Sequence, residues 1–323
     1  MNEKRIETVG GYSWPYQIKD DGTAEIIGKP SPEPEGELVI PDKLGGCSVT
    51  GIGDKAFMRC TMTDVTIPDS VTSIGVGAFH GCWKLSDANG FVVVRNVLYS
   101  YHGTDGAVTI PDTVKVIGAW AFHECDDITS VAIPAGVRAI AEGTFEGCSK
   151  IESFTVSSDN PAYAAVDGLL LTKDGKIFVR GLNKETVTIP EGVMRIADGA
   201  FADCGELTRV AIPVGVTSIG EEAFARCRWL EDVVLPFGVT TIEEYAFFCC
   251  SGLKAVTIPS SVAIIGHNAF HDCDGLTVKM ENGVTSIRPT ALTVRVSTGD
   301  AERVRKLLAD AGEDMSKLTS KEV

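Results

Sequence analysis

Cysteine is the residue type whose number and spacing first suggest chemistry in this chain of 323 residues. Eight of its ten cysteines stand three residues after a phenylalanine. Such a series could bind zinc through thiolates, form disulfides or fill a hydrophobic core. The pairs are Phe57/Cys60, Phe79/Cys82, Phe122/Cys125, Phe145/Cys148, Phe201/Cys204, Phe224/Cys227, Phe247/Cys250 and Phe270/Cys273.

The spacing favours core packing among these three roles. Zinc needs convergent ligands such as a C-x-x-C pair, and the sequence contains none. Stacked turns lie about 5 Å apart, within the Cα range of a disulfide, but equivalent side chains point the same way, which keeps their Cβ atoms apart. We therefore expect buried thiols in weak contact with backbone groups, with no metal and no cofactor.

Two cysteines lie outside the series. Cys249 follows Phe247 by two residues, where other repeats carry charged residues, so we expect it to face solvent. It is then either an inert surface residue or a reactive thiol. Cys47 follows the first predicted strand, and the sequence does not place it further.

Three histidines share one position of the repeat, directly after the phenylalanine: His80, His123 and His271. Together with Glu124, two of them could form a surface metal site. Because no third and fourth ligand stand at a defined spacing, we expect solvated surface histidines instead.

Catalytic motifs are missing from the sequence. It has no hydrolase elbow, P-loop, dinucleotide-binding glycine pattern or H-E-x-x-H motif. Its carboxylates are scattered over outward positions, whereas catalysis needs a pocket that shifts pKa values. We expect no enzymatic activity.

A repeat positions the Phe/Cys series. From Phe201 to Phe270 the phenylalanines recur every 23 residues. A fixed period of this length indicates a solenoid, in which each repeat is one turn stacked on the next. The unit beginning at Leu230 reads LEDVVLPFGVTTIEEYAFFCCSG.

Within each unit, V-x-I followed by proline predicts a short strand that the proline ends. The next pair, such as Val216 and Ile219, is expected to fill a bend, and a glycine such as Gly220 to allow a tight turn. The spacing of A-F-x-x-C is that of one helical or 3₁₀ turn. The prolines are Pro68, Pro111, Pro134, Pro190, Pro213, Pro236 and Pro259.

This unit resembles the leucine-rich repeats of the BspA-like, Treponema-type family over residues 38 to about 292. The family pattern is roughly L-x-x-V-x-I-P-x-x-V-x-x-I-G-x-x-A-F-x-x-C. The resemblance implies a β-rich, curved leucine-rich-repeat solenoid with a parallel sheet on its concave side and short helical or 3₁₀ turns opposite. Family members are often bacterial surface proteins used in adhesion and protein binding.

Two segments interrupt the period and divide the predicted solenoid, 38–293. The first insertion, at about 83–107, contains FVVVRNVLYSY, and the second, at about 157–186, contains YAAVDGLLLTKDGKIFVRG. Asp174-Gly175 predicts a two-residue hairpin turn. We expect the runs Phe91–Val94 and Phe154–Val156 to continue the stack, and the hairpins to project from it.

The ends are expected to cap the core. Residues 1–37 predict an N-terminal β-hairpin that turns at Asp21-Gly22, followed by a Pro-rich connector. Residues 294–323 predict a strand, a polar cap near Thr298, a capping helix and a tail. The helix has an apolar stripe and a glycine stop, namely Ala301, Val304, Leu307, Leu308 and Gly312.

The net charge and the hydropathy limit the classes of partner that we expect. The net charge of −15 disfavours nucleic acid and anionic lipid, and no apolar stretch approaches the ~20 residues of a membrane helix. The start, MNEKRIETVGGYSW, lacks the apolar region of a secretory signal. On this basis we expect a cytoplasmic location, or a cell-surface or secreted one if an N-terminal signal was removed.

We expect a non-enzymatic protein-recognition scaffold that binds a macromolecular partner through the concave face and the hairpins. A bacterial cell-surface adhesin or structural module is the alternative. The unit from Leu230 departs most from its neighbours and suggests an apolar anchor for a protein partner. The expected partner-binding residues are Arg209, Val214, Trp229, Asp232, Val234 and Phe237.

A glycan-binding protein is the third alternative. Trp120 and Tyr245 share an outward position two residues before the phenylalanine, and aromatic rings can stack on sugars. Because their turns are far apart in the stack, we do not expect them to form one site.

Overall fold

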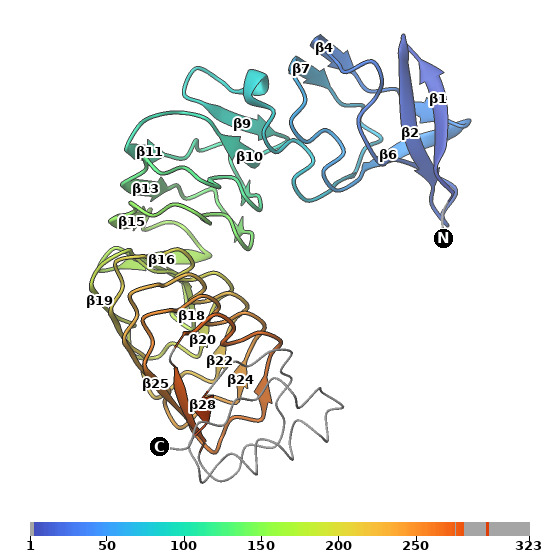
Figure 1. Ribbon diagram of the computed structural model, residues 1–323. Coiled ribbons are helices and arrows are strands. Elements are labelled where there is room, and N and C mark those ends of the chain that lie inside the picture. Colours follow the sequence, from blue (N-terminus) through green and yellow to red (C-terminus); the bar gives the residue numbers. More distant parts are fainter. Residues whose placement is uncertain (1–2, 275, 281–294, 297–323) are drawn as a thin grey trace. The chain divides into compact units, whose positions relative to one another are not determined.

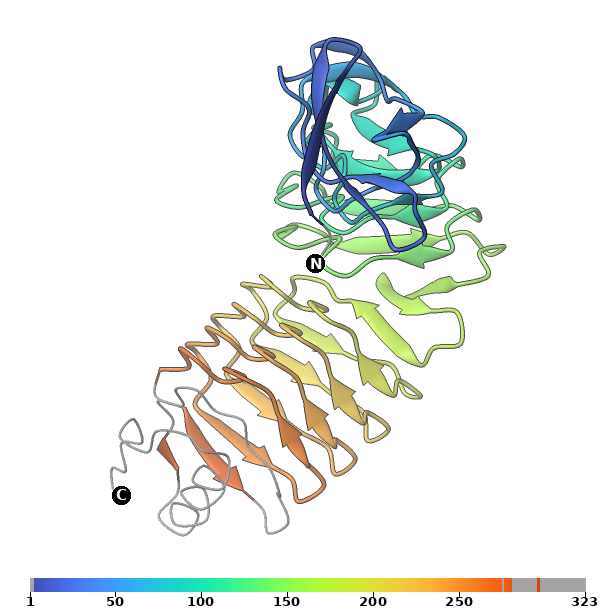
Figure 2. The ribbon, with the colours of Figure 1, turned by 90° about the vertical axis from the view of Figure 1, so that its right-hand side faces the viewer.

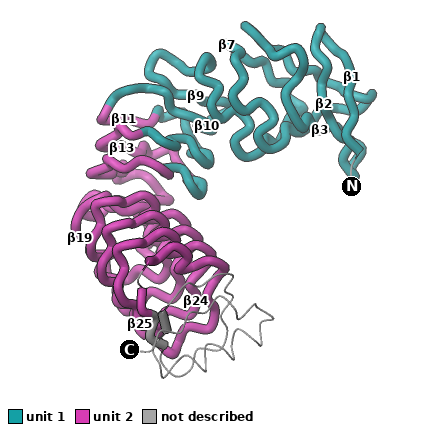
Figure 3. The backbone as a smooth tube through the Cα atoms, in the orientation of Figure 1, with its two compact units in different colours: residues 1–105, 111–125, 139–145 teal, residues 106–110, 126–138, 146–323 magenta. Residues whose placement is uncertain are grey.

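The computed structural model describes residues 3–274, 276–280 and 295–296. Figure 1 shows a ribbon built almost entirely of short strands. The chain divides into two compact units (Figure 3). Unit 1 comprises residues 1–105, 111–125 and 139–145, and unit 2 comprises residues 106–110, 126–138 and 146–323. Each unit is a β-solenoid and is described by itself.

The V-x-I segments of unit 2 form the predicted parallel strands. They follow one another as successive rungs, which Figure 2 shows from yellow to orange. The register advances by one repeat per rung, so that Thr186 is opposite Arg209 and Arg209 opposite Asp232. One sheet contains β11 (Ala107–Thr109), β13 (Ser130–Ile133) and β15 (Ser153–Val156). The other contains β19 (Thr186–Thr188), β21 (Arg209–Ala211), β23 (Asp232–Val234), β25 (Ala255–Ile258), β27 (Thr277–Met280) and β28 (Arg295–Val296).

The prolines end these strands as predicted. Pro213 follows β21 and Pro236 follows β23. The carbonyl of each proline then accepts a hydrogen bond from a buried valine three residues on, Val216 or Val239 (3.1 and 3.2 Å). The proline therefore starts a turn that carries the chain into the next side of the repeat.

A third sheet runs along unit 2, where the sequence indicated only a bend. Ile219 lies in β22 and is buried. Two-residue strands are too short to show the alternation that reveals longer ones. This sheet contains β18 (Ile177–Arg180), β20 (Arg195–Ile196), β22 (Ser218–Ile219), β24 (Thr241–Ile242) and β26 (Ile264–Ile265), joined by β16 (Tyr163–Val166) and β17 (Leu169–Thr172).

Unit 1 contains three sheets. The N-terminal sheet is formed by β1 (Arg5–Val9), β2 (Tyr12–Ile18), β3 (Ala24–Ile26), β5 (Lys43–Leu44), β6 (Cys47–Ile52) and β8 (Ser73–Ile74). The second pairs β4 (Gly36–Val39) with β7 (Met62–Thr66). The third contains β9 (Phe91–Val94), β10 (Val97–Tyr101), β12 (Val116–Ile117) and β14 (Ala139–Ile140).

At the N-terminus, β2 and β3 pair antiparallel around Asp21 and Gly22, and β1 pairs with β2 through a turn at Gly10 and Gly11. These strands bury Trp14 and Tyr16. Their role as a cap stays a prediction. The helix predicted for the C-terminus lies outside the described residues.

The A-F-x-x-C segments form consecutive turns rather than helices. Among the described residues the only helix is the 3₁₀ helix η1 (Trp83–Leu85). Two residues of each segment have a positive φ: the residue two positions before the phenylalanine and the residue two positions after it. Around Phe224 these are Glu222 (50°) and Arg226 (61°). Residues in this left-handed region cannot continue a helix, which explains the difference.

The glycines that recur at one position of the repeat serve close approach rather than a left-handed turn. A Cβ on Gly220 would lie 2.7 Å from the backbone nitrogen of Asp198 in the preceding turn, and one on Gly266 would come still closer to that of Glu244. Both distances are below van der Waals contact. Glycine is therefore needed because neighbouring turns touch at this point.

The first insertion is part of the stack and does not project from it. β9 and β10 form a hairpin whose turn, Arg95-Asn96, has both residues at positive φ. β10, not the predicted run Phe91–Val94, pairs parallel with β12 and so forms the next rung. Its Tyr99 packs edge-on against Phe79, and its Tyr101 lies 5.5 Å from Phe122 between ring centroids.

The second insertion is built in the same way. β16, β17 and β18 form an antiparallel meander, and β18 then pairs parallel with β20. The two-residue turn is Asp167-Gly168, whereas Asp174-Gly175 lies in a four-residue loop between β17 and β18. The run Phe154–Val156 does continue the sheet, since β15 pairs with β13.

Candidate partner-binding surface

The strands of unit 2 place the expected binding residues on one face. In β23 the central Val233 is buried, while Asp232 and Val234 on either side of it are exposed, because side chains alternate along a strand. Arg209 is exposed on β21 directly opposite Asp232. All six residues named from the sequence are exposed: Arg209, Val214, Trp229, Asp232, Val234 and Phe237.

Three of these residues lie together at the carboxyl ends of their strands. Val214 is 80% exposed, Val234 is 71% exposed and Phe237 is 73% exposed. Val214 and Phe237 occupy the same position of consecutive repeats, and a Cβ on Gly238 would lie 2.9 Å from the Val214 carbonyl oxygen. These residues, Val214, Val234 and Phe237, are called the apolar cluster below.

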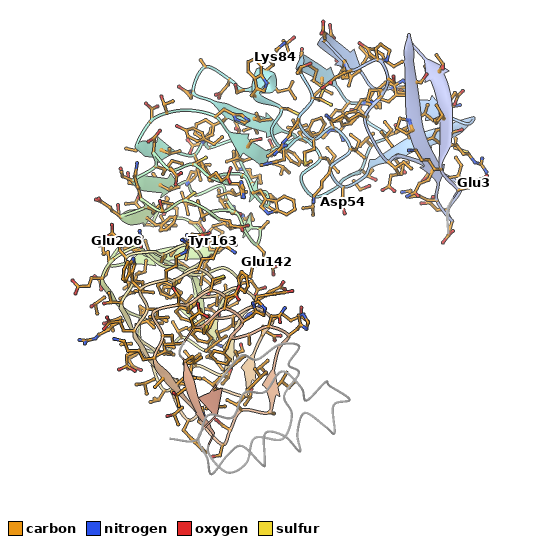
Figure 4. The ribbon with its side chains drawn as sticks, viewed as in Figure 1. Glu3, Asp54, Lys84, Glu142, Tyr163 and Glu206 are labelled. Carbon is orange, nitrogen blue, oxygen red and sulfur yellow. The ribbon has the colours of Figure 1, made fainter. Side chains whose placement is uncertain are left out.

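Trp229 is separate from the apolar cluster. It is 67% exposed and precedes β23, whereas Phe237 follows the same strand. Trp229 stands three residues before β23, whereas Val234 is the last residue of that strand, so the strand lies between them. Glu206, labelled in Figure 4, holds the position of Trp229 one repeat earlier. The surface therefore has two ends, with Arg209 and Asp232 nearer to Trp229.

The phenylalanines of the Phe/Cys series stack as a column inside the solenoid. In unit 2 the ring centroids of Phe201, Phe224 and Phe247 follow one another at 5.0 Å, and their planes differ by 9° or less. Phe178 of β18 extends the column at 5.0 Å from Phe201. The series is therefore core, and the second insertion contributes a member that the interrupted period had concealed.

The thiols of the series bind the preceding turn. Cys227, Cys250 and Cys273 each donate from Sγ to the carbonyl oxygen of the phenylalanine one repeat earlier, at 3.1, 3.1 and 3.0 Å. All ten cysteines lie among the described residues, and no disulfide joins any of them. Each of these thiols therefore fastens one turn to the next as a hydrogen-bond donor.

Burial sets the protonation of the thiols in the series. It raises the pKa of Cys60 and of Cys204 to about 11 and that of Cys82 to about 12. These thiols therefore stay protonated near neutral pH, and Cys82 donates from Sγ to the Phe57 carbonyl oxygen at 3.0 Å. Cys148 and Cys273, each the last cysteine of an uninterrupted run of repeats, are also buried, with 2% and 3% of their surface exposed.

Cys125 is the exception, and the expectation of a buried thiol is wrong there. It is half-buried, and its Sγ lies 3.8 Å from the carbonyl oxygens of Tyr101 and His123. The turn before Cys125 is the end of β10 in the first insertion and not an A-F-x-x-C segment. This strand end covers the thiol less completely than a full repeat does.

The two cysteines outside the series are half-buried. Cys249 Sγ lies 3.6 Å from Asp272 Oδ2, and burial together with this carboxylate raises the pKa of the thiol. A raised pKa argues against a reactive thiolate. Cys47 begins β6, and its Sγ lies 3.7 Å from the Gly45 carbonyl oxygen.

The histidines do not assemble a metal centre among the described residues, where no group of three or more potential ligands could hold an ion. The His80 and His123 rings lie 6.4 Å apart between centroids, and His123 Nδ1 lies 3.8 Å from Glu124 Oε2. Burial lowers the pKa of His80, since it disfavours the charged imidazolium. His271 belongs to unit 2 and contacts Asp272 at 3.1 Å.

Trp120 and Tyr245 belong to different units and both have positive φ. The Lys55 ammonium lies 4.6 Å from the centroid of Trp120, over its ring. Tyr245 packs edge-on against Phe248 and His267. Both rings therefore already have partners within their own units.

The sequence did not reveal several polar side chains that hold the insertions in place. Arg95 Nη2 donates to the carbonyl oxygen of Pro68 (2.7 Å), and Asn160 Nδ2 donates to those of Pro134 (2.7 Å) and Val137 (3.1 Å). Arg180 is buried and donates to the Gly199 carbonyl oxygen at 2.6 Å. Hydrogen bonds to a turn 19 to 27 residues away leave no local sequence signal.

An ionic network joins three turns of unit 2. Arg226 donates to Asp203 at 2.7 Å, and its guanidinium also contacts Glu146 at 3.1 Å and Glu222 at 3.4 Å. The hydrogen bond with Asp203 raises the pKa of Arg226, so the guanidinium stays charged. This network crosslinks neighbouring turns and does not include the candidate surface.

No helix among the described residues is long and apolar enough to cross a membrane.

Comparisons with known proteins agree with this architecture. The family model "BspA type Leucine rich repeat region" matches the chain in six copies, over residues 47–91, 93–163 and 175–295. A comparison with curated protein sequences gave no match.

Solved structures of bacterial leucine-rich repeat proteins are similar to the chain. The pneumococcal vaccine antigen PcpA has a TM-score of 0.58 at 15% identity, covering 100% of this chain and 98% of that chain. A leucine-rich repeat protein from Eubacterium ventriosum has a TM-score of 0.51 at 22% identity, covering 88% and 86%. The T. pallidum leucine-rich repeat protein has a TM-score of 0.40 at 24% identity, covering 69% and 95%.

Proposed function

Because the chain belongs to the family of BspA-type leucine-rich repeat proteins, we propose that it is a non-enzymatic recognition scaffold that binds a protein partner. Repeat scaffolds of this kind present extended surfaces on which a few exceptional residues supply most of the binding energy. The proposed anchor is the apolar cluster. Arg209, Asp232 and Trp229 form the polar and aromatic margin at the other end of the same strands.

One observation carries this proposal. The apolar cluster occupies two positions of the repeat, one shared by Val214 and Phe237 and one held by Val234, and all three side chains are exposed to solvent. Val234 has Ala211 and Thr257 as its counterparts, and Phe237 has Val214 and Ser260. Exposed apolar side chains of this size lose their contact with water when a partner covers them, which supports their assignment to an interface.

The insertions have a smaller part than the sequence suggested. Their strands are largely buried, and their exposed parts are turns such as Arg95-Asn96 and the loop 173–176. We assign these turns an accessory role at the margin of the interface. Deletion of either insertion would remove rungs of the solenoid and so would not test recognition.

The test compares Phe237→Asp with Met194→Asp, a substitution of another exposed apolar residue of unit 2. Each immobilised protein is incubated with an extract of the source cells and of the cells that they meet. A partner is expected to be retained by the wild-type protein and by Met194→Asp, and lost by a folded Phe237→Asp variant. Equal retention by all three proteins would remove the apolar cluster as the binding site.

A further inference from the structure

One strand of unit 1 has an open edge at the first insertion. Among the described residues, β7 pairs only with β4, whereas β21, β23 and β25 of unit 2 each pair on both sides. The repeat that should supply the next strand begins at Leu85, but it has Ala88 and Gly90 where other repeats have valine and isoleucine. The chain instead turns away around Asp87, whose carboxylate accepts from the Asn89 and Phe91 amides.

This missing strand leaves the end of the hydrophobic core uncovered. Val65, Ile67 and Leu85 occupy inward positions of the repeat, yet all three are only half-buried. Their counterparts in unit 2, such as Val233, Leu235 and Leu253, are buried. The difference follows from the absence of a neighbouring rung that would bury these side chains.

A cavity of about 360 Å³ lies at this place, next to the helix η1, where Figure 4 labels Lys84. Val65, Ile67, Leu85 and Val93 form its apolar lining. Its volume falls in the range of sites that bind ligands. Asp64 and Arg95 supply charged groups to the same lining.

Side chains form hydrogen bonds with the backbone groups at the open edge of β7. The Val65 amide donates to the Asp64 carboxylate at 2.8 Å, and the Ile67 carbonyl oxygen accepts from Arg95 at 3.2 Å. Asp64 and Arg95 therefore take the place of a neighbouring strand. Because both are exposed, another chain can exchange these hydrogen bonds for its own.

We propose that this groove binds an extended peptide segment of another protein, which adds a strand to β7. The peptide carries two apolar side chains in V-x-I spacing, which cover Val65, Ile67 and Leu85 as a rung does elsewhere. It runs parallel to β7, as every rung does, and so places its carboxyl end near Arg95. A carboxylate after the second apolar residue suits this position. The site is in unit 1 and does not depend on the apolar cluster of unit 2.

The second insertion shows that an interruption need not leave such a groove. There Phe154, which corresponds to Val65 as the inward residue of the last strand, is buried. Its amide donates to the carbonyl oxygen of Gly168 at 2.8 Å, so the turn of the hairpin covers the edge of β15. The open edge is thus a property of the first insertion and not of insertions in general.

The probe is a fluorescein-labelled peptide, LKAVTID, which reproduces the strand of residues 253–258 with a terminal carboxylate. Its binding to the full chain is measured by fluorescence anisotropy, with LKASTSD as the control peptide. LKAVTID is expected to bind saturably, and the control about tenfold more weakly, because it lacks the two apolar side chains. Absence of saturable binding up to about 1 mM would overturn the proposal.

Three variants locate the binding. Val93→Arg fills the groove and is expected to weaken binding about tenfold, whereas Val39→Arg, on the exposed face of β4, leaves it unchanged. Asp64→Ala releases the Val65 amide and is expected to tighten binding about threefold, since the carboxylate no longer competes. This variant alters an exposed residue, so it also serves if Val93→Arg fails to fold.

Two outcomes contradict the assignment. Equal binding by the wild-type protein and a folded Val93→Arg variant would place the peptide elsewhere, as would weaker binding by Asp64→Ala. Concentration-dependent dimers that Val93→Arg abolishes would show that a second copy of this chain occupies the groove instead of a partner's peptide.

Discussion

Both insertions keep the solenoid continuous where a repeat is missing, but they differ in how completely they do so. Each replaces a missing repeat with a hairpin whose aromatic side chains continue the phenylalanine column, Tyr99 and Tyr101 in the first and Phe178 in the second. Only the second covers the edge of the strand before it. The difference shows that continuity of the core and closure of the sheet are separate requirements in a solenoid, and that a chain can meet the first without the second.

The largest expected effect tests whether the insertions are part of the core. Phe178→Ala should cost about 3–5 kcal/mol of unfolding free energy, as should Phe224→Ala in the unbroken run, because each leaves a cavity in the column. Both are measured by denaturant unfolding. A cost below about 1 kcal/mol for Phe178→Ala alone would mean that the second hairpin packs loosely outside the stack.

The next effect concerns the side chain that fastens the second insertion. Asn160 is buried, donates to the carbonyls of Pro134 and Val137, and accepts from the amides of Ala162 and Tyr163. Asn160→Ala leaves these groups unpaired and should cost about 2–4 kcal/mol in the same measurement. The exposed neighbour Asp159→Ala is the control and should change stability by less than about 0.5 kcal/mol. Equal effects would contradict this role.

Arg95 fastens the first insertion, and its loss should cost less because its side chain is partly exposed. It donates to the carbonyls of Val71, Ile67 and Pro68. Arg95→Ala should lower stability by about 1–2 kcal/mol. Arg95→Lys should restore little, since an ammonium cannot match the planar fork of a guanidinium. Full rescue by lysine would indicate a purely electrostatic role.

The smallest expected effect is measured on the wild-type protein, in which the edges of β7 and β15 are compared directly. The Val65 amide is held only by an exposed carboxylate, whereas the Phe154 amide is held by a backbone carbonyl beneath a hairpin turn. Native-state hydrogen exchange should therefore be faster at Val65 than at Phe154, by about tenfold or more. Equal exchange rates would mean that both edges are closed in solution.

Much of the fold could be predicted from the sequence because a repeat displays its pattern several times. The Phe/Cys series, the V-x-I strands and the prolines were all visible in this way. The pairing of β20, β22, β24 and β26 was not, since these strands have two residues each, nor were the left-handed positions that replace the predicted helical turns. Phe178 stands 23 residues before Phe201, so the period itself offered a signal that the second insertion remains in phase.

The Phe/Cys series also shows where a repeat pattern misleads. Cys125 has the same spacing from its phenylalanine as Cys148 and Cys273, yet it alone of the three is half-buried. Its cover comes from the preceding turn, which the first insertion has replaced. Cys204 also follows an insertion, yet only 1% of its surface is exposed, so the incomplete cover at Cys125 is a property of the first insertion.

The candidate surface was predictable only in part. Departure from the repeat identified Val234 and Phe237, because a repeat defines what an ordinary residue is at each position. It could not show that Trp229 lies at the other end of the strand, which depends on where β23 begins. The groove beside β7 forms because one repeat lacks its strand, which leaves β7 paired only with β4 among the described residues. The pattern of residues in the sequence does not show how strands pair.

The most direct test of the account places a photo-crosslinking residue on the surface itself. Phe237→p-benzoylphenylalanine is compared with Met194→p-benzoylphenylalanine after irradiation in extract of the source cells and of the cells that they meet. If the partner binds at the apolar cluster, a discrete crosslinked protein forms from position 237 and none from position 194. The same products from both positions, or none from position 237, would contradict the claim that the chain recognises its partner through the apolar cluster.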